Sequence, residues 1–337
     1  MQQWRDTLKQ LRQLQANFNT AKEADVPKIR EDFKTTLEQA RQLIPTLRDT
    51  GAAAYVAIAK QDRDSAKFRD IEGFLVKLLS DDVASDRYEE ADALAKAMIG
   101  AGCDVRIVYD AGGLAAVCTN DFATAETDLK KAEQEGALSE KGKEILSQLP
   151  ELKKAWEDEQ KIREKEAKED NLPRVKIQTS KGDIVVELFE NEAPDTVGNF
   201  ISLVEKKFYN GLTFHRVLKQ FMAQGGCPSG DGTGGPDYNI FCECYKDNYR
   251  RHFRGSLSMA HAGRDTGGSQ FFLTFVPTTQ LNGRHTVFGR VIEGMDVLAK
   301  LQRIDPEDKG SKPETDKILS MEVLRKRDHE YKPSKVQ

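Results

Sequence analysis

The fold of this chain is decided by residues 214–226, which read Phe214-His215-Arg216-Val217-Leu218-Lys219-Gln220-Phe221-Met222-Ala223-Gln224-Gly225-Gly226. Between Arg216 and Gln224, an arginine, a glutamine and two large apolar side chains lie close together, and glycines follow them directly. We expect the functional site to start from these side chains. The segments before them are expected to carry, position or supply that site.

The sequence on both sides of this stretch has the pattern of a β-rich domain. After Pro173, residues 174–180 alternate apolar and polar side chains, Lys181-Gly182-Asp183 supply a turn, and residues 184–189 predict a second strand. Helical patterns occur at residues 193–204 and 295–301, and further strands are predicted at 271–275, 286–292 and 318–324. Many short strands with few helices predict a barrel.

Size and composition fit a soluble protein with more than one domain. The 337 residues include 38% hydrophobic and 31% charged residues, which is enough apolar content for a core. A net charge of -4 provides no basic surface for phosphate backbones, so we expect no nucleic-acid partner. No window approaches about 18 uncharged apolar residues, so we expect no membrane partner. Residues 1–6 lack the apolar run of a secretory signal, which predicts a cytoplasmic protein, or a periplasmic or exported one if a signal peptide was trimmed.

Residues 1–138 have helical periodicity and predict an all-α domain. Apolar side chains recur every three or four residues at Trp4, Leu8, Leu11 and Leu14, and a second periodic run follows Pro27. The first part of this half therefore predicts a helical hairpin, which we expect Pro45 and Gly51 to interrupt.

The rest of the helical half contains an internal repeat. A separation of 34 residues relates Tyr88 to Phe122, Ala91 to Ala125, Ala95 to Leu129, Met98 to Ala132, and Gly102 to Gly136. This is the tetratricopeptide period, so the region weakly resembles a short tetratricopeptide array, and a generic helical bundle is the alternative. An array implies a concave face for a protein or peptide partner, and no contact residue is predicted.

Residues 139–171 are rich in lysine and glutamate. Charges of both signs at helical spacing predict a solvated helix that acts as a semi-rigid spacer. Asn171-Leu172-Pro173 is expected to end this helical linker, because the residue before a proline disfavours the helical conformation.

Several motifs follow one another in the C-terminal half: Ala193-Pro194-Asp195-Thr196-Val197-Gly198-Asn199-Phe200, the stretch at 214–226, Gly255-Ser256-Leu257-Ser258-Met259-Ala260-His261-Ala262-Gly263, Gly268-Ser269-Gln270-Phe271-Phe272, and Leu281-Asn282-Gly283-Arg284-His285-Thr286-Val287-Phe288-Gly289. Together they resemble the cyclophilins, a family of peptidyl-prolyl cis-trans isomerases. The resemblance implies an eight-stranded antiparallel barrel with two capping helices at residues 172–328, followed by a tail at 329–337. The N-terminal half lies outside the resemblance.

The chemistry of such an isomerase needs no bond cleavage and no cofactor. Rotation about a peptide bond crosses about 18–20 kcal/mol because conjugation flattens the bond. A fixed donor aimed at the proline nitrogen acts only in the twisted state, where that nitrogen has regained a lone pair. The resemblance assigns this role to Arg216, whose guanidinium is a rigid and permanent cation. Gln224 is expected to orient Arg216 and the substrate carbonyl.

The resemblance also assigns the substrate-binding residues. The apolar pocket for proline is expected from Phe221, Met222, Phe272, Leu281 and His285. Gln270 is expected near the substrate backbone and Ala262 in the adjoining pocket. The main chain of His261 is expected to pair with the extended substrate. His261 stands where many cyclophilins have asparagine. Gln280 stands where cyclosporin-sensitive members have tryptophan, which predicts weak cyclosporin binding.

Other sites have weaker support. His215 has no nucleophile motif beside it, and the glycines at 225–235 lack the lysine that ends a phosphate loop, so we expect neither a hydrolase nor a nucleotide site. Cys242-Glu243-Cys244 leaves redox sensitivity open, with no metal expected. His252 and His329 have no companion motif and are expected to be solvated.

The function expected is therefore an isomerase that assists protein folding. Its partners would be proline-containing peptide segments or protein clients, with a protein partner or client recruited by the N-terminal helices. The alternative is a chaperone or scaffold that holds proline segments without turnover.

Overall fold

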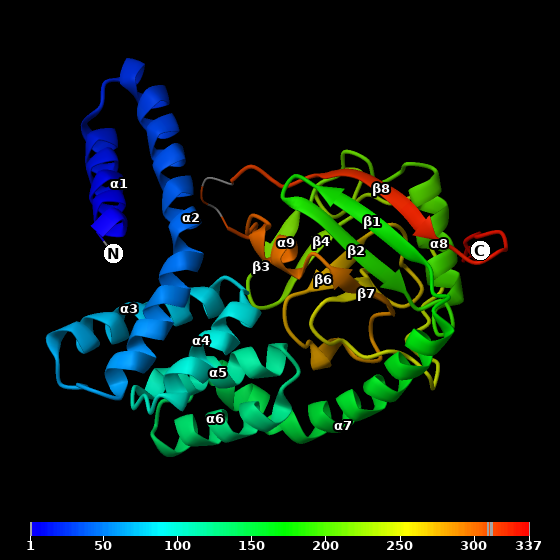
Figure 1. The fold of residues 1–337 in the computed structure, drawn as a ribbon. Coiled ribbons are helices and arrows are strands. Elements are labelled where there is room, and N and C mark those ends of the chain that lie inside the picture. Colours follow the sequence, from blue (N-terminus) through cyan, green and yellow to red (C-terminus); the bar gives the residue numbers. More distant parts are fainter. Residues whose placement is uncertain (1, 309, 311–312, 337) are drawn as a thin grey trace. The chain divides into compact units, whose positions relative to one another are not determined.

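The computed structural model describes residues 2–308, 310 and 313–336 (Figure 1). The chain forms two compact units, Met1–Ser80 with Ala93–Val108, and Asp81–Asp92 with Tyr109–Gln337. Within the described residues, no helix is both long enough and apolar enough to cross a membrane.

The first unit begins with the predicted helical hairpin, but its second helix has no interruption. Helix α1 spans Gln2–Thr20, a 3-10 turn (η1) spans Glu23–Asp25, and α2 spans Val26–Ala59. The prediction that Pro45 and Gly51 interrupt α2 was wrong. Proline removes one backbone donor, yet buried Tyr55 extends the apolar side of α2 beyond it and stacks on Phe68 at 4.7 Å.

Gly51 has a packing role in this unit. A Cβ atom at Gly51 would lie 3.1 Å from Cδ2 of Leu75, a residue of α3 (Ala66–Ala84). Glycine therefore lets α2 and α3 approach closely. The apolar contact explains why the helix continues through a residue of low helix propensity.

Three short helices carry the 34-residue repeat. They are α4 (Tyr88–Gly100), α5 (Arg106–Cys118) and α6 (Phe122–Gln134). Helices α4 and α6 have 13 residues each, and each is followed by a glycine of positive φ, Gly102 at 81° and Gly136 at 68°. Glycine takes this conformation without a Cβ clash, so the repeat marks two equivalent helix ends. The tetratricopeptide assignment itself stays a prediction.

Helix α7 (Glu140–Glu169) differs from the predicted solvated spacer. Its first half packs against α6, where Ile145, Leu149 and Leu152 share a core with Phe122 and Leu129. Glu159 and Glu166 of its second half are buried because they pair with the buried Arg250 of the second unit. A pattern of alternating charges cannot show a partner that lies far away in the sequence.

The second unit contains the predicted barrel. Its strands are β1 (Arg174–Thr179), β2 (Gly182–Leu188), β3 (Arg216–Leu218), β4 (Met222–Gly225), β5 (Ser256–Met259), β6 (Phe271–Thr274), β7 (Val287–Glu293) and β8 (Ile318–Arg325). They form one antiparallel sheet in the order β3-β4-β6-β5-β7-β2-β1-β8. The sheet curls until the segments before its edge strands meet, where the Gly211 N–H donates to the Ile318 carbonyl at 2.7 Å and the Phe214 N–H to the Asp316 carbonyl at 2.9 Å.

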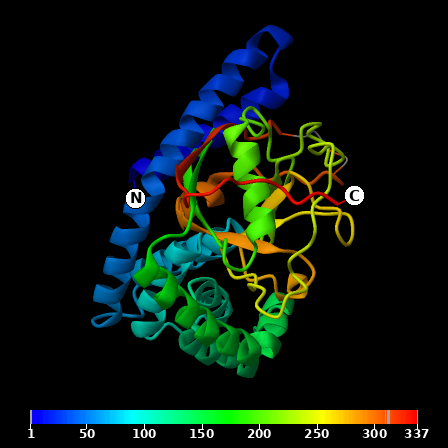
Figure 2. The same cartoon turned by 90° about the vertical axis from the view of Figure 1, so that its right-hand side faces the viewer.

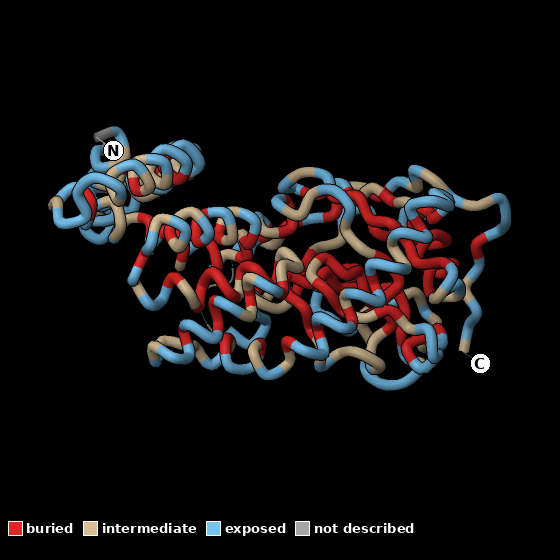
Figure 3. Tube along the Cα trace, turned by 60° about the horizontal axis from the view of Figure 1, so that its bottom comes forward, coloured by how far each residue is buried: buried red, intermediate tan, exposed pale blue. Residues whose placement is uncertain are grey.

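Two helices cover the barrel, as predicted. They are α8 (Pro194–Glu205) and α9 (Met295–Lys300), and a 3-10 turn (η2) spans Thr279–Leu281. Figure 2 shows α8 lying along the barrel wall. Phe200 of α8 packs against the rings of Phe271 and Phe288, with centroids 5.7 and 5.2 Å away. Figure 3 shows buried residues both in the barrel and along the helices that follow the hairpin, whereas α1 has few.

Candidate active site

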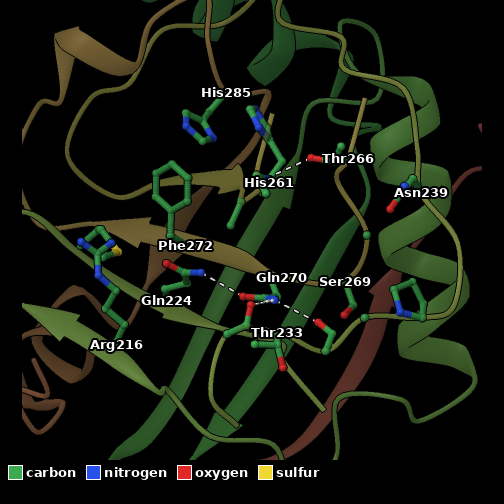
Figure 4. Close-up of a pocket in the computed structure, with 18 of the residues that line it drawn as sticks. Arg216, Gln224, Thr233, Asn239, His261, Thr266, Ser269, Gln270, Phe272 and His285 are labelled. Carbon is green, nitrogen blue, oxygen red and sulfur yellow. Dashed lines mark hydrogen bonds between the residues drawn. The ribbon is translucent and has the colours of Figure 1, made fainter. Parts of the chain in front are cut away.

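The register of three strands places the central residues of the site in one row. Arg216 on β3 lies opposite Gln224 on β4, and Gln224 lies opposite Phe272 on β6. Directly opposed residues of antiparallel strands project to the same face of the sheet and have neighbouring side chains. The arginine, the amide and the aromatic ring therefore lie side by side, as Figure 4 shows.

This row borders a pocket of about 740 Å³. The pocket brings together all the side chains that the sequence predicted for the site: Arg216, Phe221, Met222, Gln224, His261, Ala262, Gln270, Phe272, Leu281 and His285. Figure 4 shows Arg216, Gln224, Phe272 and His285 on one side of it and Asn239, Thr266 and Ser269 on the other. The individual roles of these residues stay predictions.

Arg216 has its charge available at the pocket. Its guanidinium lies 5.8 Å from the centre of the Phe221 ring, a distance that allows a cation–π contact. In the part of the chain that the structure describes, no carboxylate forms an ion pair with Arg216. Its N–H donors are therefore free for a bound peptide.

The amides of two glutamines are fixed by one another. The Gln224 amide nitrogen donates to Oε1 of Gln270 at 3.0 Å. The Gln270 amide nitrogen donates in turn to the carbonyls of Gly232 and Gly234, at 2.8 and 2.9 Å. This chain of bonds sets the orientation of Gln224 and leaves its Oε1 as an acceptor toward the pocket.

The glycine-rich segment forms turns in the pocket wall. Gly230 and Gly232 have φ of 71° and 91°, in the region that favours glycine. The Cys227 sulfur accepts N–H bonds from Gly232 and Gly234, at 3.3 and 3.2 Å, which holds the loop in place. Burial alone would raise the pKa of the Cys227 thiol, but these backbone donors lower it on balance.

The upper wall of the pocket contains the imidazoles of His261 and His285 beside Phe272. His285 Nδ1 donates to the Met259 carbonyl at 2.9 Å, and burial lowers the pKa of His285, so its Nε2 is an unprotonated acceptor near neutral pH. The edge of the Phe272 ring meets His285 at 5.6 Å. His261 stacks on His285 at 4.1 Å and holds the Arg284 carbonyl through Nε2 at 2.7 Å.

His252 lies behind Phe272, contrary to the prediction that it is solvated. It is only 1% exposed and stacks parallel to the Phe272 ring at 5.9 Å. Its two nitrogens bond to Asn282 Oδ1 at 3.0 Å and Ser258 Oγ at 2.9 Å. These partners lie 30 and 6 residues away, so no local motif could reveal them. His329 is exposed, as predicted, although its Nε2 bonds to Oε1 of Glu190 at 2.5 Å.

Some pocket residues were missed by the sequence analysis. Thr233, Asn239, Thr266 and Ser269 line the polar side of the pocket. Thr266 Oγ1 accepts the Ala262 N–H at 3.0 Å and donates to the Gly263 carbonyl at 2.8 Å. The available signals were Ser269 inside a quoted motif, and Thr233 and Thr266 next to glycines.

Comparison with known proteins identifies the family. Residues 174–323 match the family described as cyclophilin type peptidyl-prolyl cis-trans isomerase/CLD. A peptidyl-prolyl cis-trans isomerase of Helicobacter pylori is 54% identical over 149 residues, which cover 43% of this chain and 91% of that protein. The chain belongs to the cyclophilin-type peptidyl-prolyl cis-trans isomerases. Its cyclophilin domain catalyses cis-trans isomerisation of peptidyl-prolyl bonds.

Other peptidyl-prolyl isomerases are similar to a part of this chain that is less than half of its length. Peptidyl-prolyl cis-trans isomerase B of Bacillus subtilis is 53% identical over 122 residues, covering 36% of this chain and 85% of that protein. The crystal structure of a cyclophilin type isomerase of Cryptosporidium parvum is 32% identical, covers 46% of this chain and 99% of that chain, and gives a TM-score of 0.42. The helical half of this chain lies outside the family match.

The cysteine pair of this cyclophilin lies close to the pocket wall. The Cys242 sulfur accepts the Asp265 N–H at 3.2 Å, and the hydrogen bond from Cys244 lowers the pKa of Cys242 to about 6. Both thiols are free. Among the described residues, no group of three or more His, Cys, Asp or Glu side chains is arranged to hold a metal ion.

Proposed function

We propose that Arg216 is the catalytic donor of this isomerase and that the pocket beside it holds the proline of an X-Pro segment. The observation that supports this most directly is the cross-strand row of Arg216, Gln224 and Phe272. It sets an unpaired guanidinium in the same pocket as the apolar side chains of Phe221 and Phe272. The proline ring would rest on Phe272 and Met222, with the N–H donors of Arg216 directed at its nitrogen.

The donor acts on the twisted bond and not on the planar one. In the planar amide, the nitrogen lone pair is conjugated and accepts poorly. As the bond rotates, the lone pair localises and accepts a charge-assisted hydrogen bond. Such a bond contributes about 1.5–3 kcal/mol. Because it forms only in the transition state, it accelerates rotation by roughly 10- to 160-fold.

The neighbouring groups restrict the substrate to this geometry. The Gln224 amide is fixed by Gln270, so its Oε1 presents a defined acceptor to the substrate backbone. Neutral His285 adds no second cation to the pocket, which keeps the proline wall weakly polar. With the proline ring and the substrate backbone held in this way, rotation takes place about the X-Pro bond between them.

The test uses exchange NMR of a short Ala-Pro peptide with catalytic amounts of full-length protein. Replacement Arg216→Ala is expected to lower kcat/KM by roughly 10- to 160-fold, the range given by one charged hydrogen bond. Arg216→Lys retains the charge without the planar fork and is expected to fall between the two. An Arg216→Ala protein that is folded and as active as the wild type would refute the assignment.

We further propose that residues 1–138 recruit protein clients to the isomerase. Support comes from a groove of about 260 Å³ within the α1–α2 hairpin, lined by Leu14, Gln15, Phe18, Ile29, Arg30 and Phe33. Phe18 remains 41% exposed there. An unfolded client that displays apolar side chains fits this groove better than a folded, polar surface does.

A further inference from the structure

The strand that carries Arg216 has little support of its own. Strand β3 has three residues and lies at the edge of the sheet, where one side of its backbone lacks a neighbouring strand. The tight turn after it is closed by the Phe221 N–H, which donates to the Leu218 carbonyl at 3.2 Å. The position of the catalytic arginine therefore depends on whatever holds this edge.

The turn itself contains an unfavourable residue. Gln220 has φ of 55°, in the left-handed region. A residue with a Cβ loses roughly 1–2 kcal/mol there, and glycine is the usual occupant. A glutamine persists in such a position only when surrounding contacts hold it.

Asp86 supplies the contact that holds Gln220. The Gln220 N–H donates to Asp86 Oδ1 at 2.9 Å, although 134 residues separate them in the chain. Asp86 lies in the turn between α3 and α4 and is fully buried. Its Oδ1 also accepts the Tyr88 hydroxyl at 3.1 Å. The Tyr88 hydroxyl thus helps to orient the Asp86 carboxylate that accepts the Gln220 N–H.

Arg303 completes the attachment on the other carboxylate oxygen. Its Nη2 donates to Asp86 Oδ2 at 2.7 Å and to the Ser85 carbonyl at 3.0 Å. The next residue, Ile304, exchanges two backbone hydrogen bonds with Val217 of β3, at 2.8 and 2.9 Å. One ion pair therefore connects the turn after β3 with the segment that covers the free edge of β3.

The contacts of Arg303 extend through Phe275 to Phe221 in the pocket wall. The guanidinium of Arg303 lies over the Phe275 ring at 4.5 Å, and the Phe275 N–H donates to the Phe221 carbonyl at 2.9 Å. Phe221 follows Gln220 directly and places its ring against Arg216. A change in the turn would therefore move both a wall of the proline pocket and the support of the catalytic cation.

We propose that Asp86 is a positioning residue of the isomerase, which holds the β3–β4 turn through Gln220 so that Phe221 and Arg216 keep their places in the pocket. The inference rests on the proposed role of Arg216. It adds that part of the active-site geometry is set by a residue outside the cyclophilin domain, in the turn between two helices.

The experiment compares variants of the full chain with a short Ala-Pro peptide. Asp86→Ala is expected to lower kcat by about tenfold, because small misplacements of catalytic groups are costly, and to change peptide affinity less. Asp86→Asn keeps an acceptor oxygen for Gln220 and is expected to remain within about threefold of the wild type. Glu89→Ala is the matched control, since Glu89 pairs with Arg254 of the barrel without touching the turn.

A second substitution separates positioning from a loss of folding. In the Asp86→Ala background, Gln220→Gly removes the cost of the left-handed turn and is expected to recover about half or more of the lost activation free energy. Circular dichroism establishes the folded fraction at the assay temperature. The backbone amide signals of Gln220 and Phe221 should shift in Asp86→Ala and return toward the wild type in the double variant.

Two outcomes would overturn the inference. The first is a folded Asp86→Ala protein with wild-type kcat. The second is a loss of activity that Gln220→Gly does not restore while the Phe221 signal stays unchanged. Arg216→Ala is measured in parallel, because a wild-type rate there would refute the proposed donor and not the positioning by Asp86.

Discussion

At the scale of single residues, the site depends on imidazoles that stay neutral close to a permanent cation. His252 supports Phe272 from behind, and His285 forms part of the wall in front of it. Burial lowers the pKa of both, that of His252 to about 3. Near neutral pH, His252 and His285 therefore carry no charge.

Acid should destabilise the protein through His252. Its pKa is about 3 in the folded protein and near 6.5 when unfolded, so the unfolded chain binds the proton more readily. The contribution to stability is complete above the unfolded value and is lost as the pH falls from there toward 3. The slope is about 1.4 kcal/mol per pH unit, or roughly 2–3 kcal/mol between about pH 6 and pH 4.

Urea denaturation over that pH range measures this loss. His252→Asn keeps one polar partner but does not titrate, so its stability should fall less with acid, from a lower starting value. Equal pH slopes in the variant and the wild type would exclude His252 as the titrating group.

At the scale of elements, α7 is attached to the barrel by buried charges. The Arg250 guanidinium is 1% exposed and donates to Glu159 at 2.7 and 3.0 Å and also to Glu166. Arg290 donates to the other oxygen of Glu166 at 2.8 Å, and Arg250 also lies 3.7 Å from the centre of the Phe189 ring. Each buried charge has opposite charges around it, as burial of ions requires.

Removing one charged partner from this buried cluster should therefore lower the stability of the protein strongly. Glu166→Ala leaves buried arginine charge without its match and is expected to lower the free energy of unfolding by about 3–5 kcal/mol. Lys161→Ala on the same helix is the control, because the exposed Lys161–Asp158 pair should change stability by less than about 0.5 kcal/mol. Chemical denaturation of both proteins provides the comparison, and equal midpoints would show that α7 is not held by these charges.

The residues whose roles could be predicted from the sequence lie in local motifs. The residues whose roles could not be predicted have partners far away in the chain. Arg216, Gln224 and Phe272 lie in contiguous motifs, so the family resemblance located the pocket, whereas a strand was predicted only for Phe272 and not for the short strands β3 and β4. Asp86 and Arg250 act through partners far away in the chain, and neither has a neighbouring residue that marks its role. Pro45 misled for a related reason, because burial of Tyr55 outweighs the local preference to break the helix.

At the scale of the whole molecule, a helical half accompanies a domain that corresponds to most of a bacterial isomerase. Under the proposed function, the helices raise the local concentration of a client and leave the chemistry to the barrel. Activity on short peptides and activity on proteins should then respond differently to changes in the α1–α2 groove.

Phe18→Ser tests this division in the full chain. The change removes an apolar contact worth about 1.5–3 kcal/mol if a client buries that ring. Acceleration of refolding of a proline-limited protein is expected to fall by about fivefold or more, while kcat/KM for an Ala-Pro peptide stays unchanged. Gln10→Ser, at an exposed position of α1 outside the groove, should affect neither rate. Equal loss on both substrates would contradict the recruiting role.

The hydrogen bond from Gln220 to Asp86 also affects whether the cyclophilin domain can be separated from the helices before it. A cyclophilin domain excised at residue 172 would retain the left-handed glutamine and lose the carboxylate that holds it. Transplanting this barrel into another fusion protein would meet the same difficulty unless a glycine replaced the glutamine. Under the proposed roles of Arg216 and Asp86, the helical half supplies part of the support of the active site, so the excised domain is expected to be less active than the full chain.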